Sequence, residues 1–253
     1  MTVLDMFSLT GRVAIVTGAS SGLGVHFAVA LAEAGADVVV AGRRAERLAD
    51  TVALVEATGR RALAVPTDVT DPDSATALVE AAVAHFGHVD VLVNNAGIGT
   101  SFPATRETPE QFRAVLDTNL MGAYWVAQAC GRVMTPGSTI VNISSVIGLT
   151  TQALPQAAYA SSKAGLIALT RDLAHQWTGR KGIRVNALAP GFFETEISGS
   201  YAEGYVESQL QRVAAGRQGD PRELAATLVW LVSAAAGYVT GQTVVVDGGF
   251  SIG

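Results

Sequence analysis

The chain has 253 residues, of which 49% are hydrophobic and only 15% are charged, a composition that suits a large buried core and is unlike that of a disordered chain. Its net charge of −5, with basic residues scattered except for short pairs, argues against a nucleic-acid partner. The single cysteine, Cys130, excludes an intrachain disulfide and a cysteine zinc cluster, and its apolar helical surroundings predict a packing role.

Seven short runs rich in β-branched residues predict strands, in chain order at 13–17, 38–41, 62–66, 89–94, 138–144, 183–189 and 243–247. They are almost continuously hydrophobic, which is typical of parallel strands covered on both faces. Segments with a helical period predict helices at about 22–34, 45–57, 73–86, 109–131, 156–178 and 222–234. We therefore predict an α/β fold, a doubly wound parallel sheet of seven strands with helices on both faces. Functional residues should lie beyond the carboxyl ends of its strands.

No linker, low-complexity tract or internal repeat divides the chain, so we expect residues 1–253 to form one dinucleotide-binding and catalytic domain. The segment at about 192–213 has no strong period and follows the sixth strand, and we expect it to form a lid over the substrate. The N-terminus does not resemble a secretory signal, and no apolar run approaches the roughly 18 residues of a membrane span. We expect a cytoplasmic protein without a membrane partner.

A glycine-rich turn, TGASSGLG at 17–24, joins the first strand to the first helix. Glycine lets the backbone approach a pyrophosphate, and the helix N-terminus offers free N–H groups and the positive end of its dipole. The glycine spacing differs from the common Gly-x-Gly-x-x-Gly form, so simple turn chemistry would be the alternative if the position between strand and helix were unknown. The predicted nucleotide contacts are Gly18, Ser20, Ser21, Gly22, Leu23 and Gly24.

The second strand is followed by Arg43 and Arg44. An NAD site usually has an acid here that holds the ribose 2′-hydroxyl, whereas arginine can pair with the 2′-phosphate of NADP. The absence of an acid favours NADP(H) over NAD(H). The alternative is that the two arginines only solvate the start of the helix at 45–57.

Further motifs occur in chain order: Asp68-Val69, Asn94-Asn95-Ala96-Gly97, Asn119, Ser144-Ser145, Tyr159 to Lys163, Pro190-Gly191 with Thr195, and Val246-Asp247-Gly248-Gly249. With the glycine turn they make the chain resemble, from end to end, the classical short-chain dehydrogenase/reductase (SDR) family. The resemblance implies a Rossmann-type fold, a nicotinamide cofactor and a homotetramer.

The resemblance also implies roles for several of these residues. Asp68 and Val69 would meet the adenine, Asn95, Ala96 and Gly97 would line the cofactor, and Pro190, Gly191 and Thr195 would border the nicotinamide. Asp68 has a structural alternative, as the cap of a turn before Pro72, and the Asn-Asn-Ala-Gly stretch could tie loops to the sheet.

Tyr159 and Lys163 are four residues apart on the predicted helix 156–178, so their side chains share one face. Free tyrosine has a pKa of about 10, and a neighbouring ammonium favours the phenolate and lowers that pKa. Tyr159 could then donate a proton to a carbonyl oxygen during reduction and remove it during oxidation. The resemblance implies that Lys163 also holds the nicotinamide ribose. Without the other motifs, a surface pair would be the simpler interpretation.

Ser145 ends the fifth strand, where its hydroxyl could stabilise charge on the substrate oxygen. The family pattern favours Ser145 over Ser144, but its separation from Tyr159 is one residue longer than in many relatives, which leaves the choice between the two serines open. The resemblance implies that Asn119 anchors a water that links Lys163 to solvent. Considered alone, Asn119 would more often bond the local backbone.

The sequence therefore predicts an NADP(H)-dependent oxidoreductase that interconverts a carbonyl of a small molecule and a secondary alcohol. A 3-oxoacyl thioester reductase and a sugar-acid or polyol dehydrogenase remain open as alternatives. A non-catalytic NADP(H)-binding regulator is a third alternative, although it would be expected to lack the tyrosine, lysine or serine. The four histidines have no metal-ligand spacing, so no metal site is expected.

Overall fold

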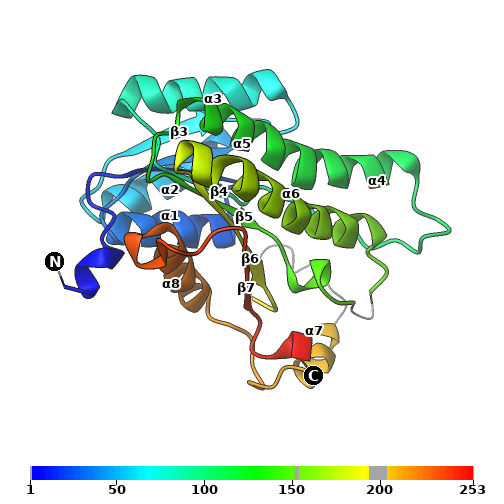
Figure 1. Cartoon of the computed structure of the whole chain (residues 1–253). Helices are drawn as coiled ribbons and strands as arrows, with labels where there is room; N and C mark the ends of the chain where they lie inside the picture. Colours follow the sequence, from blue (N-terminus) through cyan, green and yellow to red (C-terminus); the bar gives the residue numbers. More distant parts are fainter. Residues whose placement is uncertain (1, 152–153, 194–203, 253) are drawn as a thin grey trace.

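The computed structural model describes residues 2–151, 154–193 and 204–252, along which strands and helices alternate (Figure 1). The strands are β1 (Val13–Thr17), β2 (Asp37–Gly42), β3 (Ala62–Pro66), β4 (Val91–Asn94), β5 (Thr139–Ile143), β6 (Arg184–Pro190) and β7 (Thr243–Val246). The α-helices are α1 (Leu23–Glu33), α2 (Ala45–Glu56), α3 (Pro72–Phe86), α4 (Pro109–Leu116), α5 (Gly122–Val133), α6 (Ala157–Lys181), α7 (Tyr205–Leu210) and α8 (Pro221–Val232).

The strands form one sheet with the order β3-β2-β1-β4-β5-β6-β7, and every neighbouring pair is parallel. The chain winds outward from β1 to β3 and then crosses to the other side of β1, where it continues from β4 to β7. The predicted doubly wound parallel sheet is confirmed. Because β1 and β4 lie side by side where the winding reverses, the ligand crevice is expected beyond their carboxyl ends.

Two hydrophobic cores, one on each face of the sheet, explain why the strands lack an alternation of polar and apolar residues. Val16 of β1 packs into the core under α1, α2 and α8, whereas its neighbour Ile15 packs into the core under α3, α5 and α6. Cys130 is fully buried in the second core, and burial raises the pKa of its thiol. A packing role is consistent with this position.

Two details differ from the sequence-based expectations, and a third expectation falls outside the described residues. The predicted helix 109–131 is interrupted by a π-helical turn at Asp117–Met121, which separates α4 from α5. The segment after β6 contains a short helix, α7, that the sequence period did not indicate. Thr195 and the rest of 194–203, which belong to the predicted lid, lie outside the described residues. None of the helices in the described ranges is both long and apolar enough to span a bilayer.

Candidate active site

The glycine-rich turn lies between β1 and α1, at the switch point of the sheet. Gly18 has a φ of +66°, and a Cβ there would lie 2.8 Å from the Cα of Ala96. At Gly24 a Cβ would lie 2.3 Å from the carbonyl oxygen of Gly18. Both positions therefore require glycine, which lets the turn approach the loop after β4. Since α1 begins at Leu23, its free N–H groups face the space beside the turn.

Hydrogen bonds join this turn to the loop that follows β4. The Oγ1 atom of Thr17 accepts bonds of 3.0 Å from the backbone N–H groups of Asn95 and Ala96. The Nδ2 atom of Asn95 donates to the carbonyl oxygens of Thr17, at 2.9 Å, and Gly18, at 3.2 Å. Asn95 thus ties two loops together, as its structural alternative predicted, while it also borders a cavity.

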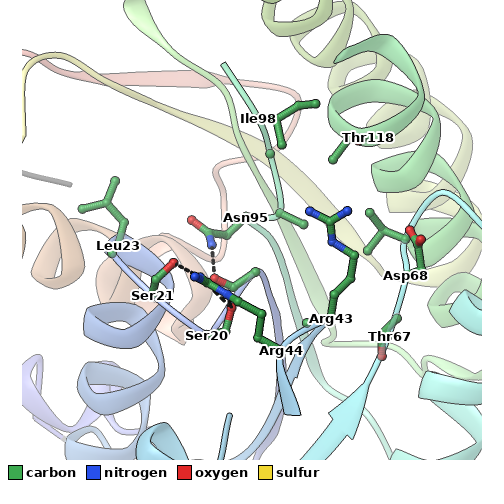
Figure 2. Close-up of a pocket in the computed structure, with 16 residues that line it drawn as sticks. Ser20, Ser21, Leu23, Arg43, Arg44, Thr67, Asp68, Asn95, Ile98 and Thr118 are labelled. Carbon is green, nitrogen blue, oxygen red and sulfur yellow. Dashed lines mark hydrogen bonds between the residues drawn. The ribbon is translucent and has the colours of Figure 1, made fainter. Parts of the chain in front are cut away.

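That cavity has a volume of about 320 Å³ and opens at the carboxyl ends of β1, β2, β3 and β4 (Figure 2). It brings together nearly all the residues predicted for the pyrophosphate and adenine: Gly18, Ser20, Ser21, Gly22, Leu23, Arg43, Arg44, Asp68, Val69, Asn95, Ala96 and Gly97. Gly24 does not line the cavity and instead supports the turn from behind. The lining fits a dinucleotide, because the start of α1 and the two arginines after β2 border the space where phosphate groups would bind.

The two arginines after β2 have different positions (Figure 2). Arg44 folds back on the glycine turn, where its Nε and NH2 atoms donate to the Oγ of Ser20 at 3.3 and 3.2 Å. Its NH2 atom also donates to the Oγ of Ser21 at 2.6 Å. Arg43 instead extends into the cavity beside Asp68. Both guanidinium groups therefore border the cavity and do more than solvate α2.

The position of Asp68 is compatible with both of its predicted roles. Its Oδ1 atom accepts hydrogen bonds from the backbone N–H of Thr70, at 3.0 Å, and from the Thr70 hydroxyl, at 2.8 Å. These two bonds hold the pKa of Asp68 below its ordinary value, and the charge of Arg43 lowers it further. Asp68 thus stabilises a turn and, as a carboxylate, faces the cavity.

Tyr159 and Lys163 lie on one face of α6, with the Lys163 ammonium 5.6 Å from the centroid of the Tyr159 ring. Lys163 is buried, and its Nζ atom donates a 2.8 Å hydrogen bond to the carbonyl oxygen of Ile143. This carbonyl is accessible because β4 ends at Asn94, opposite Asn142, one residue before Ile143. Burial disfavours the charged form and lowers the pKa of Lys163 from 10.5 to about 8.

The two serines after β5 make different contacts. The Ser144 hydroxyl donates a 2.8 Å hydrogen bond to the carbonyl oxygen of Lys163, which fixes α6 against the sheet. The Ser145 hydroxyl accepts a 3.2 Å bond from the backbone N–H of Ile147, and it donates its own proton to no described residue. Ser145 therefore keeps a hydrogen-bond donor for a ligand, which favours it over Ser144 for contact with a substrate oxygen.

Asn119 lies in the π-helical turn and is almost completely buried. Its Oδ1 atom accepts a 2.8 Å bond from the N–H of Ile98, and its Nδ2 atom donates to the carbonyl of Ile98 at 2.9 Å. The same Nδ2 atom donates to the Ser162 hydroxyl at 3.0 Å, which in turn donates to the Tyr159 carbonyl at 2.7 Å. Asn119 thus links the loop after β4 to the helix that carries Tyr159. π-Helical turns are frequent at functional sites.

The end of β6 is shaped by the C-terminal motif. Pro190 pairs with Val246 of β7, and the N–H of Gly191 donates to the Val246 carbonyl at 2.9 Å. A Cβ on Gly191 would lie 2.7 Å from the Cα of Asp247, so the two loops are in close contact. The predicted nicotinamide neighbours Pro190 and Gly191 therefore lie at the carboxyl edge of the sheet, whereas Thr195 is outside the described residues.

A small apolar cluster lies beside Tyr159, and we call it the C-terminal cluster. Its buried members are Val146, Ile147, Val213 and Phe250, and the partly buried residues packed against them are Tyr159, Ala160, Phe192 and Leu210. These residues come from the segment directly after Ser145, from α6, from the residue two positions after β6, from the end of α7 and the segment after it, and from the C-terminus. The cluster therefore forms an apolar wall beside Tyr159.

Sequence reasoning did not identify four residues that line the large cavity: Gly42, Thr67, Ile98 and Thr118. Gly42 ends β2 and Thr67 directly follows β3, so the rule that ligands bind at strand ends could have indicated both. Ile98 and Thr118 are adjacent in sequence to Gly97 and Asn119, but no spacing or motif in the sequence marks either residue as a contact. In the described ranges, no group of histidine, cysteine, aspartate and glutamate side chains could hold a metal ion.

Comparison with known proteins identifies the family. Residues 18–251 match a family model described as "Enoyl-(Acyl carrier protein) reductase". The chain is 38% identical over 253 residues to 2-dehydro-3-deoxy-D-gluconate 5-dehydrogenase of Dickeya dadantii. The alignment covers 98% of each of the two chains. The chain belongs to the SDR family. It is therefore an oxidoreductase of CH–OH and C=O groups in small molecules, in a family that binds a nicotinamide cofactor.

Two other SDR proteins are similar to this chain in sequence, and one of them also in structure. The 3-oxoacyl-[acyl-carrier-protein] reductase FabG of Thermotoga maritima is 39% identical over 246 residues, with coverage of 96% of this chain and 99% of the relative. A short chain dehydrogenase from Burkholderia cenocepacia J2315, solved in complex with NADP, is 34% identical with a TM-score of 0.90. The alignment with that structure covers 95% of this chain and 98% of the solved one.

Proposed function

We propose that this SDR protein is an NADP(H)-dependent oxidoreductase that interconverts a ketone and a secondary alcohol, with Tyr159 as the acid and base. The observation that carries the proposal is the placement of the Tyr159 ring 5.6 Å from the buried Lys163 ammonium. This pair lies on the helix that Ser144 and Asn119 connect to the cofactor side of the sheet. A surface pair would have no such connections.

In the proposed reaction, the nicotinamide cofactor supplies or accepts the hydride when bound. Tyr159 donates its hydroxyl proton to the carbonyl oxygen during reduction and removes that proton during oxidation. The positive charge of Lys163 favours the phenolate form of Tyr159 and thereby eases the proton transfer. Ser145 donates a hydrogen bond to the substrate oxygen and stabilises its developing charge.

Several residues would hold the reacting groups in place. Lys163 would also contact the nicotinamide ribose, and Pro190, Gly191 and Thr195 would border the nicotinamide. Asn119 would support proton exchange between Lys163 and solvent through a water. Since the side-chain atoms of Asn119 already bond Ile98 and Ser162, this residue also positions the loop and α6.

The preference for NADP(H) rests on the arginines after β2. Arg44 lies within hydrogen-bond distance of Ser20 and Ser21, and this cationic corner is suited to a 2′-phosphate. Arg43 lies beside Asp68, where the adenine would bind. No acid follows β2 that could hold a 2′-hydroxyl in the manner of NAD sites.

The alternatives for the substrate are a 3-oxoacyl thioester and a sugar acid or polyol, and the names of the relatives include both classes. We further propose that residues 1–253 act as one dinucleotide-binding and catalytic domain, with 192–213 as a lid, in a cytoplasmic homotetramer. The sequence alone left a non-catalytic NADP(H)-binding regulator as an alternative; membership of an oxidoreductase family argues against it, and turnover of any ketone would exclude it.

The proposal is tested by replacement of Tyr159 with phenylalanine in the full chain. General acid and base catalysis contributes roughly 10²- to 10⁴-fold, so Tyr159→Phe should lower kcat for NADPH-dependent ketone reduction by about that factor. NADPH affinity, measured by fluorescence titration, should change little. Tyr124→Phe is the matched control, because the Tyr124 hydroxyl lies on α5 and contacts Gln128. If Tyr159→Phe retained most of the wild-type rate, the assigned proton donor would be wrong.

A further inference from the structure

Arg212 lies directly after α7, at the edge of the C-terminal cluster. Its guanidinium carbon is 4.6 Å from the centroid of the Phe250 ring. Phe250 is fully buried and makes an edge-to-face contact with Phe192 at 5.2 Å between ring centroids. Phe250 and Tyr159 belong to the same cluster, so Arg212 and Tyr159 both border the C-terminal cluster.

The backbone around Arg212 is well fixed. Its N–H donates to the Gln209 carbonyl at 2.9 Å, and the N–H of Ala215 donates to the Gly248 carbonyl at 2.9 Å. At Gly248 a Cβ would lie 2.8 Å from Val213, so the C-terminal motif and the segment after α7 are in close contact. The position of Arg212 relative to the catalytic side of the cluster is therefore set by the fold.

The charge of Arg212 has no counterpart within the described parts of the chain, where no carboxylate forms an ion pair with it. Arg217, five residues later, differs in this respect because it donates two hydrogen bonds of 2.8 and 2.9 Å to Glu223. A guanidinium that lies over an aromatic ring retains its in-plane N–H donors, and this geometry suits two parallel bonds to a carboxylate or phosphate. Arg212 is exposed, so a ligand can reach it.

We propose that Arg212 binds an anionic oxygen group of the substrate, a carboxylate or a phosphate, at the end away from the reacting carbonyl. This inference rests on the proposed function, because it places the carbonyl at Tyr159 and Ser145. In a chain with a net charge of −5, a local cation would also offset the repulsion of an anionic substrate. The substrate class is therefore a keto acid or a phosphate-bearing keto compound, and the C-terminal cluster packs against its carbon chain.

The experiment compares two pairs of substrates that differ in charge. The first pair is a six-carbon keto acid and its methyl ester. The second is a 3-oxoacyl coenzyme A, which carries phosphates, and the corresponding N-acetylcysteamine thioester, which carries none. For each pair the readout is the ratio of kcat/KM for the charged substrate to that for the neutral one, with NADPH as reductant.

Wild-type enzyme should favour the charged member of one pair by about tenfold or more, because hydrogen bonds to charged groups are stronger than neutral ones. A preference within the first pair identifies a carboxylate, and one within the second identifies a phosphate. Arg212→Met should bring that ratio close to one, and Arg212→Lys should retain part of it. Arg217→Met, which removes another exposed arginine that is already paired, should leave the ratio as in wild type.

Each other outcome rejects the proposal in a recognisable way. If wild-type enzyme reduced both members of each pair equally, or if Arg212→Met kept the wild-type ratio, the anion site would be wrong and the reductase function would stand. If wild-type enzyme reduced none of the four substrates with either NADPH or NADH, both the proposed function and the anion site would be rejected.

Discussion

The proposed cofactor side and the proposed substrate side of this site are built in different ways. On the cofactor side, consecutive residues form a turn in which Gly18 and Gly24 are required by contacts of 2.8 and 2.3 Å that a Cβ would make. On the substrate side, the C-terminal cluster combines residues from five segments of the chain, at 146–147, 159–160, 192, 210–213 and 250. A ligand site defined by backbone proximity can therefore be recognised from a short motif, whereas one defined by packed side chains requires the folded chain.

Ser144 and Ser145 test whether the catalytic side depends on single side-chain groups. Loss of one donor to a developing oxyanion typically costs about 10²- to 10³-fold in kcat, so Ser145→Ala should lower kcat for ketone reduction by this factor. Ser144→Ala removes only the bond to the Lys163 carbonyl and should mainly lower the free energy of unfolding, by about 1 kcal/mol. Steady-state kinetics and urea denaturation of both variants distinguish the two effects. A larger kinetic loss in Ser144→Ala would reverse the assignment.

Gly24 and Gly179 test whether the cofactor side depends on the backbone. Gly24→Ala would place a Cβ 2.3 Å from the Gly18 carbonyl oxygen, and overpacking of this kind should lower the free energy of unfolding by about 1–3 kcal/mol. NADPH affinity should fall as well, because the turn must move. Gly179 lies within α6, where an added Cβ would meet nothing within 4 Å. Because glycine destabilises a helix interior relative to alanine, Gly179→Ala should raise the free energy of unfolding by about 0.5–1 kcal/mol.

Urea denaturation and NADPH titration of both glycine variants provide the measurements. Equal effects of the two substitutions would mean that the tight contact at Gly24 is relieved by a small shift of the turn, and the contrast between the two sides of the site would lose its basis.

The sequence predicted the fold because each parallel strand is a continuous hydrophobic run, and the first of these, 13–17, coincides with β1. It could not predict the π-helical turn at Asp117–Met121, since one extra residue in a helical turn hardly changes the hydrophobic period. The motifs indicated Asn119 and Tyr159, but the link between them through Ser162 depends on contact between α6 and the π-helical turn. The choice between Ser144 and Ser145 required their hydrogen bonds in the folded chain, which cannot be read from the spacing of residues in the sequence.

Arg44 is an exception on the cofactor side, because it adds a side-chain contact to a site that is formed mainly by the backbone of the glycine turn. Hydrogen bonds to charged groups contribute about 1.5–3 kcal/mol, so Arg44→Ala should lower kcat/KM for NADPH by about 10- to 100-fold. The value for NADH should change far less, because NADH has no 2′-phosphate. Arg47→Ala, on the exposed surface of α2, is the matched control and should preserve the ratio of NADPH to NADH. An equal loss with both cofactors would assign Arg44 to support of the turn alone.

Lys163 connects the two sides, and the effect of its titration depends on pH. Burial lowers the pKa of Lys163 to about 8, so the ammonium predominates below that pH and is lost as the pH rises through it. Since kcat/KM reports ionisations of the free enzyme, its value for ketone reduction should fall by about tenfold for each pH unit above 8. Lys163→Met should be slow at every pH and should lack this inflection. A wild-type profile that stayed flat to pH 9.5 would show that the ammonium persists despite its burial, and the charge on Lys163 would then have to be stabilised by more than the Ile143 carbonyl.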